Sequence, residues 1–550
     1  MDADIVIRGG TVIDGTGTPG RAADVAVSGG RIVGVGDGLS GARELDASGQ
    51  VVAPGFIDIH THYDAQVFWD PGLTPSAFHG VTTVVAGNCG FSIAPVRPDG
   101  VELLARTLQH VEDMSFETLA AGVPWDSFET FPQYLDAVAK GGVGLNYGCY
   151  VGHTAVRLFV MGPEAYERPA TADELVRMQQ VVAEAMAGGA IGFATSASPT
   201  HNGAGGLPVP SRVGDLAELE ALLDPVRDAG KGVVAMLPGG VITNDEMFDL
   251  QRRVGRPFTW TALLTLKGLP YHQGVVEAHD TAWADGVEVW PQVSCRPLVF
   301  QMNLLDPFPF NMRPSFAALM DTSIEERYEA YRDPAWREAA RAEMSRGLPV
   351  NWDALSVVES DARPDLVGRN IVELSAELGT TPFDTMLDIA LEDDLRTRFN
   401  SVLANNDPEG IAWLLPRDNV LLGLADSGAH VSQLCDACFA TDLLGTWVRE
   451  REVMPIERAI HKLTAEPAGV YGLHDRGVVA EGKAADLVVF DPTTVAPGPL
   501  RRVHDFPADG ERLTADAPVG VTHTLVNGVP IRVDGTQVSG LAELPGVVLR

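Results

Sequence analysis

Short apolar runs separated by glycine mark both ends of the chain. Between residues 4 and 58 the runs are joined at Gly9-Gly10 and Gly29-Gly30, and near the C-terminus a run at 485–490 precedes a turn signal at Asn527-Gly528. Apolar runs joined by such pairs are typical of β-hairpins. Neither end has enough strands to bury a core of its own. We therefore predict one small β-sandwich domain built from both termini, residues 1–58 and 476–550.

The middle of the chain has a different pattern, in which short apolar runs alternate with helical stretches. This alternation is typical of βα units around a parallel sheet. Eight such units predict an α/β fold, a (β/α)8 TIM-like barrel over residues 59–475, with its chemistry at the carboxyl ends of the strands. The predicted strands are Gly55–His62, Val81–Gly87, Gly144–Val151, Gly189–Thr195, Lys231–Leu237, Pro257–Leu264, Gly286–Val293 and Asn419–Asp426.

The last two predicted strands are separated by far more chain than any other neighbouring pair. Connections in compact domains are usually short, so we predict an insertion at about residues 296–375. It begins with an aromatic, methionine-rich stretch, LVFQMNLLDPFPFNM. Two interpretations stay open: a lid over the mouth of the barrel, or a structural elaboration packed on the outer helices.

Composition and charge narrow the class of protein and its partners. The 550 residues are 45% hydrophobic, which excludes global disorder, and 40 basic against 74 acidic residues give a net charge of −34. Such a charge repels phosphate backbones and anionic lipid, so we expect neither nucleic acid nor a membrane as a partner. Five cysteines, an odd number, and an acidic N-terminus without an apolar segment predict a reduced, cytoplasmic protein without a signal peptide. Homo-oligomer formation is left open.

Two histidines at the end of the first barrel strand are the first candidates for chemistry. His60 and His62 are two residues apart, so in a strand their imidazoles point the same way, into the barrel mouth. This spacing presents two imidazoles to one divalent ion. The pair alone is a weak motif, and its position at a strand end strengthens it.

Asp426 ends the eighth predicted strand, which neighbours the first strand in a closed barrel. A carboxylate after a buried strand is costly unless it is paired, bound to a metal or catalytic. Beside His60 and His62 it would complete a site in which a metal activates water and Asp426 accepts the proton. The alternative is an aspartate that caps the following helix.

Three further residues follow predicted strands. Cys89 after the second strand offers a soft thiolate ligand, and a buried inert cysteine is the alternative. His153 after the third strand and His201 after the fourth would serve as metal ligands, oxyanion stabilisers or substrate contacts. For each histidine the alternative is a loop or core residue satisfied by hydrogen bonds.

Taken together, these motifs resemble the metal-dependent amidohydrolase superfamily, and within it the N-acyl-D-amino-acid deacylase (D-aminoacylase) family. The resemblance covers nearly the whole chain, through DIVIRGGTVIDGTG, VVAPGFIDIHTHYDAQVFWDP, GVTTVVAGNCGFSIAP, VGHTAVR, GGAIGFATSASPTH, GLADSGAH and GVVAEGKAADLVVFDP. It implies that His60, His62 and Cys89 are zinc ligands and that Asp426 is the general base and acid, also placed at the metal.

Two departures from the family pattern stand out. The family has metal-binding histidines after the fifth and sixth strands, where this chain reads Val234–Pro238 and Leu263–Lys267. No lysine lies near the fourth strand to form the carbamylated bridge of other amidohydrolases. The resemblance therefore implies a site with one Zn2+ ion favoured over two.

The resemblance implies a hydrolase that cleaves the amide bond of an N-acylated amino acid, a small molecule, to a carboxylic acid and a free amino acid. In this hypothesis His153, His201, Arg157 and Arg296 are candidates for binding the oxyanion or the substrate carboxylate. The alternatives are hydrolysis of a cyclic amide, an Nε-acyl-lysine or an aryl-amide, and a barrel without catalytic activity that serves as a scaffold. The aromatic insertion favours a sizeable apolar group on the substrate.

Overall fold

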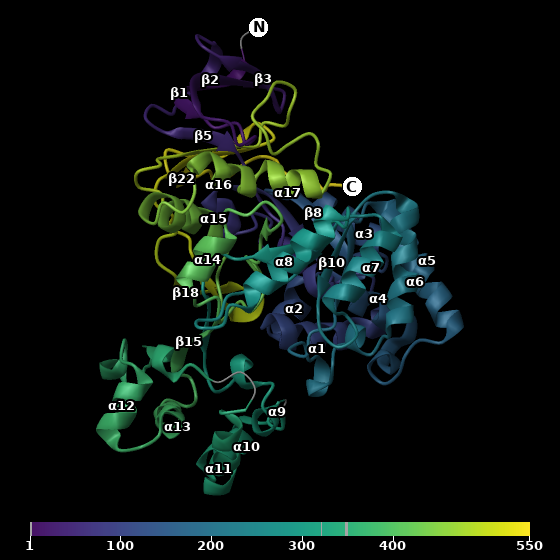
Figure 1. Cartoon of the computed structure of the whole chain (residues 1–550), viewed down its shortest axis with the longest axis vertical. Coiled ribbons are helices and arrows are strands. Elements are labelled where there is room, and N and C mark those ends of the chain that lie inside the picture. The colour runs from purple at the N-terminus through teal and green to yellow at the C-terminus, as the bar shows by residue number, and fades with distance from the viewer. Residues whose placement is uncertain (1–2, 321, 347–349) are drawn as a thin grey trace.

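A curled parallel sheet of eight strands forms the centre of the computed structural model, which describes residues 3–320, 322–346 and 350–550 (Figure 1). Each of the eight predicted segments overlaps one of its strands. In sheet order they run β16-β12-β11-β10-β9-β8-β7-β6 and all neighbouring pairs are parallel. Their bounds are β6 Phe56–Asp58, β7 Val81–Ala86, β8 Asn146–Gly152, β9 Gly192–Ser196, β10 Val233–Leu237, β11 Phe258–Trp260, β12 Val289–Val293 and β16 Leu421–Leu422.

The two edges of this sheet meet beyond the ends of β6 and β16. Thr61 and Ser427 form a parallel bridge, and the backbone N–H of His62 donates to the carbonyl oxygen of Ser427 over 2.7 Å. Gly428 follows with a φ of 89°, and a side chain there would lie 2.8 Å from the carbonyl oxygen of His62. Only glycine fits so close an approach at this angle. The contact brings the ends of the first and last strands together.

Helices in the connections surround the sheet. Their sequences contain clear start and stop signals: Thr171 and Glu174 form a capping box at the start of α5, and Gly189, in a left-handed conformation, ends it. The bounds are α1 Val101–Glu112, α2 Phe116–Gly122, α3 Phe131–Gly141, α4 His153–Met161, α5 Ala172–Gly188, α6 Leu216–Ala229, α7 Asn244–Val254, α8 Tyr271–Ala284, α14 Pro408–Leu414, α15 Phe439–Asp442, α16 Ile456–Leu463 and α17 Ala465–Val470, with a π-helix at Leu443–Glu450 between α15 and α16.

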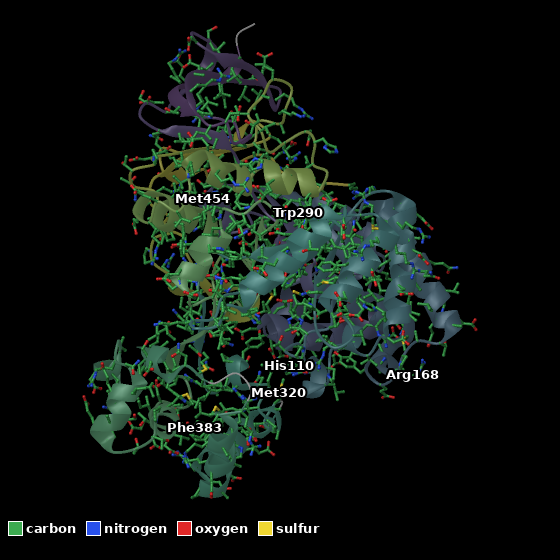
Figure 2. All side chains as sticks on the ribbon, in the orientation of Figure 1. His110, Arg168, Trp290, Met320, Phe383 and Met454 are labelled. Carbon is green, nitrogen blue, oxygen red and sulfur yellow. The ribbon has the colours of Figure 1, made fainter. Side chains whose placement is uncertain are left out.

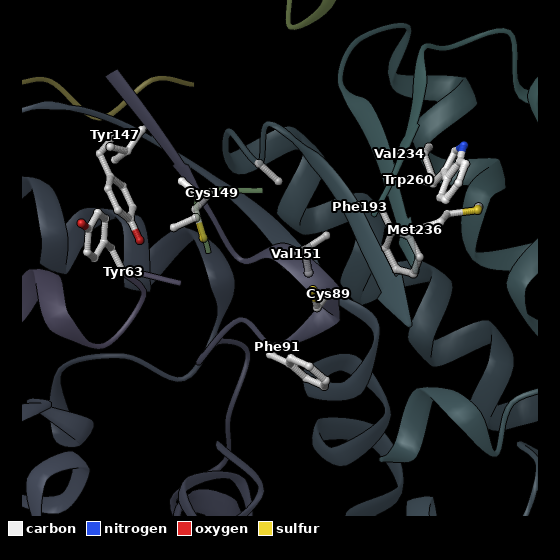
Figure 3. Close-up of a cluster of buried hydrophobic side chains, with 14 of the residues drawn as sticks. Tyr63, Cys89, Phe91, Tyr147, Cys149, Val151, Phe193, Val234, Met236 and Trp260 are labelled. Carbon is white, nitrogen blue, oxygen red and sulfur yellow. The ribbon is translucent and has the colours of Figure 1, made fainter. Parts of the chain in front are cut away.

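One buried hydrophobic cluster extends over the curled sheet and the helices around it. Cys89, Phe91, Val151, Phe193 and Trp260 all belong to it (Figure 3). Strands β7 and β8 are buried at every position, as expected for parallel strands covered on both faces. No helix in the described ranges combines the length and apolar character that crossing a bilayer requires.

Strands from both termini share one sheet, as the glycine-punctuated runs suggest. The described residues form a nine-stranded sheet in which β5 pairs with β1 in parallel and with β17 in antiparallel. Strands β18 and β19 form a separate two-stranded antiparallel sheet. The bounds are β1 Ala3–Val12, β2 Arg21–Ser28, β3 Arg31–Gly36, β4 Gly41–Asp46, β5 Val51–Pro54, β17 Leu487–Phe490, β18 Arg501–Phe506, β19 Gly510–Thr514, β20 Val521–Val526, β21 Val529–Val533 and β22 Thr536–Gln537.

The glycine pairs at the N-terminus have two different roles. Gly29 and Gly30 make the turn between β2 and β3, both with positive φ, and Asn527-Gly528 turns β20 into β21 in the same way. Gly9-Gly10, expected to join two strands of a hairpin, lies inside the single strand β1. There the pairing with β2 shifts between Ile7 and Gly10, so this pair makes a bulge and the hairpin prediction is wrong at that point.

The inserted segment is a lobe with its own core (Figure 1). Its antiparallel sheet, in the order β13-β15-β14, reaches to residue 404, further than the predicted end at 375. Phe383 lies in the core of this lobe, and Met320 lies at its boundary with the body of the protein, near His110 of α1 (Figure 2). The bounds are β13 Leu298–Met302, α9 Pro314–Ala317, α10 Ile324–Arg332, α11 Pro334–Glu343, β14 Ser356–Glu359, α12 Ile371–Leu378, α13 Pro382–Glu392 and β15 Arg398–Ala404.

Candidate metal centre

Three side chains that follow the first two strands converge. His60 and His62 come just after β6, and Cys89 comes just after β7. One ligand atom from each lies within 4.8 Å of the others, and all three residues are buried. They are the only such group of histidine, cysteine or carboxylate residues in the described ranges. We refer to His60, His62 and Cys89 as the donor cluster.

Asp426, at the far end of the sheet order, lies against the donor cluster. Its Oδ1 is 3.1 Å from His62 Nε2 and 3.4 Å from His60 Nε2, and Cys89 Sγ is 3.6 Å from His60 Nε2. Ligand atoms around a tetrahedral zinc ion are separated by about 3.3 Å for N and O and about 3.5 Å for N and S, given the usual bond lengths. These three distances lie close to those separations, although Asp426 is not part of the mutually close group of His60, His62 and Cys89.

The Nδ1 atoms of both histidines face oxygen atoms, which leaves the Nε2 atoms for the cluster. His60 Nδ1 is 2.8 Å from Gln292 Oε1 and 3.1 Å from Thr261 Oγ1. His62 Nδ1 is 2.9 Å from Glu112 Oε1, at the end of α1. Metal-binding histidines usually donate their second ring N–H to such an acceptor, which fixes the tautomer. His62 Nε2 and both carboxyl oxygens of Glu112 are buried without a hydrogen bond of good geometry, so the His62–Glu112 contact is an ion-pair distance.

The electrostatics of the site favour a positive charge at its centre. Burial lowers the pKa of His60, but Asp426 and Cys89 outweigh it and raise the pKa to about 10. Burial likewise opposes the charge of Asp426, whose pKa the two imidazoles nevertheless hold well below its ordinary value. The pKa of the Cys89 thiol is lowered by the same imidazoles against the effect of burial. A cation surrounded by these donors would be stabilised in the same way.

Left-handed backbone at non-glycine residues concentrates around this site. Cys89, Leu424, Asp426 and His430 have φ between 48° and 56°, and all four line one cavity. Such conformations cost energy, and they persist where the surrounding structure holds a side chain in one position. The backbone thus fixes the orientation of the Asp426 carboxylate and the Cys89 thiol.

The cavity has a volume of about 360 Å³, and most of its wall is apolar. The family resemblance places histidines at the ends of β10 and β11. Apolar residues stand there in this chain: Leu237, which ends β10, with Pro238, and Ala262 with Leu264 after β11. The remaining lining residues are His60, His62, Cys89, Phe91, Val111, Glu112, Ser198, Thr200, His201, Trp260, Thr261, Leu298, Phe300, Phe308, Leu403, Leu424, Asp426, Ala429 and His430.

The lobe supplies part of this wall. Leu298 and Phe300 of β13, Leu403 of β15 and Phe308 line the cavity. The ring of Phe308 packs on that of His430 with centroids 4.3 Å apart. The distal helices of the lobe are absent from the lining. The insertion is thus a cavity wall at its base and a separately packed elaboration beyond it.

Of the four residues predicted to bind the substrate, His153, His201, Arg157 and Arg296, the structure brings only His201 to the cavity. Its Nδ1 is 2.8 Å from Ser196 Oγ, and its ring packs on Phe91. Burial and the neighbouring His430 lower the pKa of His201 to about 3, so the ring is neutral. A neutral imidazole at the wall can donate or accept one hydrogen bond to a substrate.

His153 and Arg157 lie elsewhere, in a buried ionic group with Glu218 of α6. His153 Nε2 is 2.9 Å from Glu218 Oε1, and its Nδ1 is 2.8 Å from Thr195 Oγ1. Arg157 is fully buried and donates to both oxygens of Glu218 over 2.5 Å. Because both ring nitrogens of His153 and both terminal guanidinium nitrogens of Arg157 are bonded to protein partners, neither side chain is placed to bind a substrate carboxylate.

Arg296 also lies outside the cavity wall. Its Nε donates to Asp436 Oδ1 over 2.6 Å, and a guanidinium nitrogen lies 3.6 Å from Asp442 Oδ1. It begins the lobe, as predicted from its place after the seventh strand, but its charge is directed to the segment after β16. The structure therefore leaves the expected carboxylate-binding role of Arg296 without support.

Three residues at the site were not identified from the sequence. Glu112 lies in QHVEDM, which has no motif around it, and an acidic residue at a helix end looks solvent-exposed. Gln292 is an isolated polar residue in a strand. A polar residue in a predicted buried strand indicates a buried polar contact, and this pattern could have identified it. His430 was part of the recognised GLADSGAH motif, which assigns it no role.

A parallel α/β sheet with imidazole, thiol and carboxylate groups converging beyond its strand ends is the arrangement of metal-dependent hydrolases. Comparison with known proteins agrees. The model of the Amidohydrolase family matches residues 43–343 and 367–532, which is most of the chain. The chain belongs to this family. Its D-aminoacylase relatives are hydrolases that act on carbon–nitrogen bonds other than peptide bonds.

Two curated relatives match the chain almost from end to end. A D-aminoacylase of Alcaligenes xylosoxydans xylosoxydans is 29% identical over 96% of this chain and 94% of its own length. An N-acyl-D-glutamate deacylase of the same organism is 30% identical over 96% and 93%. Among solved structures, an N-acyl-D-glutamate deacylase from Bordetella bronchiseptica, complexed with zinc and a phosphonate inhibitor, has 25% identity and a TM-score of 0.69, covering all of both chains.

Proposed function

We propose that this protein is a zinc-dependent amidohydrolase that cleaves the amide bond of an N-acylated amino acid, releasing a carboxylic acid and a free amine. The observation that carries the proposal is the convergence of the donor cluster with Asp426 in one cavity. His60, His62 and Cys89 would hold one zinc ion, and Asp426 would lie at the ion as well. The deacylase relatives support this choice of reaction and metal.

The proposed architecture extends the same reasoning to the whole chain. The meeting of the sheet edges at Thr61 and Ser427 supports a (β/α)8 barrel over residues 59–475. The shared sheet of both termini supports a second domain from residues 1–58 and 476–550, in which the strands would fold over a buried apolar cluster that contains Ile7, Val25 and Leu487.

A bound zinc ion would supply Lewis-acid activation of water and of the amide carbonyl. Asp426 is ionised and adjacent, so its Oδ1 can accept the proton of the attacking water and pass it to the leaving nitrogen. His60 and His62 hold their orientation through Gln292 and Glu112. His201, neutral at the wall, is placed to hydrogen-bond the substrate. The apolar wall would exclude water and accommodate an acyl group.

Metal content together with substrate turnover tests this proposal. Purified protein should contain one equivalent of zinc, and His60→Ala should lose it while remaining folded. The zinc-loaded protein should release amine from at least one member of a panel of N-acetyl, N-lauroyl and Nε-acyl amino acids in L and D forms. Metal-free folded protein, or a fully loaded protein that cleaves no amide of the panel, would contradict the proposal.

A further inference from the structure

The wall of the candidate metal centre contains no arginine and no lysine among the described residues. The residues outside the described ranges include neither type. Outside the donor cluster, the ionisable side chains that line the cavity are the carboxyl groups of Glu112 and Asp426 and the imidazoles of His201 and His430. A substrate carboxylate normally requires a cationic partner, most often a bidentate arginine, when it leaves water.

The nearest basic side chains are engaged elsewhere. Arg212 donates to the carbonyl oxygen of His201 and to Asn202 Oδ1, each over 2.8 Å, and does not line the cavity. Arg157 and Arg296 bind Glu218 and Asp436, as described above. Lys267 lies three residues after the lining residue Leu264. Its side chain is exposed and does not line the cavity. None of these offers a charge to a group inside.

His201 and His430, the two cavity histidines outside the donor cluster, do not replace the missing arginine or lysine. Burial lowers the pKa of both His201 and His430, so both rings are neutral at pH 7. Glu112 is buried, and among the described residues its close ionic partner is His62, 2.9 Å away. An anionic group brought into this cavity would therefore meet the carboxyl group of Glu112 and neither an arginine nor a lysine, while His60 and His62 belong to the donor cluster.

We propose that the amine half of the substrate enters this cavity without a free carboxylate, so that carboxyl-blocked N-acyl amino acids are cleaved in preference to the free acids. The inference deepens the proposed amide hydrolysis and rests on it. The reaction is balanced by water alone: the acyl C–N bond breaks, the hydroxyl goes to the acyl carbon, and the proton goes to the nitrogen of an amino-acid amide.

Matched substrates that differ only in this charge provide the test. N-octanoyl-phenylalanine and N-octanoyl-phenylalaninamide, each in D and L form, would be compared with the zinc-loaded protein, and mass spectrometry would identify the released phenylalanine or phenylalaninamide. We expect kcat/KM for the amide to exceed that for the acid by at least tenfold, about the effect of one unscreened charge in a partly buried site. Equal or faster cleavage of the acid would overturn the inference and leave the proposed function intact. Failure to cleave any N-acyl compound would remove both.

Variants test whether charge in the cavity causes this preference. The quantity compared is kcat/KM for the acid divided by kcat/KM for the amide, because a general loss of activity affects both values equally. Glu112→Gln should raise the acid-to-amide ratio about tenfold. Leu264→Arg, which adds a cation to the wall, should raise it as well, whereas the neutral control Leu264→Gln should not. An unchanged ratio in both charge variants would overturn the inference. So would a tenfold fall in the ratio of Lys267→Ala, since that result would show that the exposed lysine supplies the missing charge.

Discussion

The backbone N–H of His62 donates to the carbonyl oxygen of Ser427 over 2.7 Å, which joins the first and last strands of the curled sheet at the candidate metal centre. The same serine donates its hydroxyl to Asp58 Oδ2 over 3.0 Å, and Asp58 Oδ1 accepts the backbone N–H of His60. These bonds hold Asp426 beside both imidazoles. The residue that precedes Ser427 is therefore positioned by the backbone that carries the histidines.

The thiol of Cys89 should be visible as a metal ligand. If the zinc is replaced by cobalt(II), a thiolate ligand gives a sulfur-to-metal charge-transfer absorption, because soft sulfur donates charge to the ion. We expect this absorption in the wild-type protein and its loss in Cys89→Ser. Cys149→Ser is the matched control, since Cys149 is also buried but faces Asp64. A band that persists in Cys89→Ser would exclude Cys89 from the ligand set.

Glu112 should strengthen metal binding without being a ligand of the donor cluster. Its carboxylate faces His62 Nδ1 at 2.9 Å, and removal of such an oriented acceptor commonly weakens metal affinity about 10–100-fold. We expect this loss in Glu112→Ala, measured by competition with a chromogenic chelator, and a smaller loss in Glu112→Gln, which keeps an oxygen acceptor. Glu102→Ala on the exposed face of the same helix is the control. Equal affinity of Glu112→Ala and wild type would show that Glu112 does not position His62.

The strands and the candidate metal ligands could be predicted from the sequence because they depend on local patterns. Period-two spacing put His60 and His62 on one side of a strand, and each of the eight apolar runs overlaps an observed strand. Glu112 was out of reach because its partner, His62, meets it only through the packing of α1 on the sheet. His153 and Arg157 were drawn into the predicted site by their position after a strand, but Glu218, from a later helix, takes up both. The positions of these side chains therefore depend on contacts between segments far apart in the sequence, which a local pattern does not predict.

The ionic group of Glu218, Arg157 and His153 should stabilise the fold. Removing one partner of a buried ion pair typically costs about 3–5 kcal/mol, so Glu218→Gln should lower the free energy of unfolding by an amount of this order. Its partners hold the pKa of Glu218 at about 2 against the effect of burial. A carboxyl group with a depressed pKa in the folded state contributes stability above its unfolded pKa, about 4.3, and that contribution is lost as the pH falls toward 2.

Urea unfolding of wild type and Glu218→Gln between pH 7 and pH 3 checks both statements. The difference between the two proteins should be full at pH 6–7 and smaller at pH 3. Glu220→Gln on the same helix is the control, because Glu220 forms an exposed pair with Arg253 and such pairs contribute little. A difference that is constant over this range would assign the stability of the group to packing rather than to charge.

Phe308 should determine how well large acyl groups bind. Its ring lines the cavity from the lobe and packs on His430 and on Phe300, with centroids 4.3 Å and 5.2 Å apart. Phe308→Ala removes apolar contact area that an octanoyl chain would cover but an acetyl group would not reach in full. We expect KM for N-octanoyl substrates to rise about tenfold, with kcat little changed and N-acetyl substrates affected less. Tyr328→Phe, at a half-buried position of the lobe outside the cavity wall, should leave both parameters unchanged. If KM rises equally for both acyl lengths, Phe308 acts through the position of His430 and not through contact with the acyl chain.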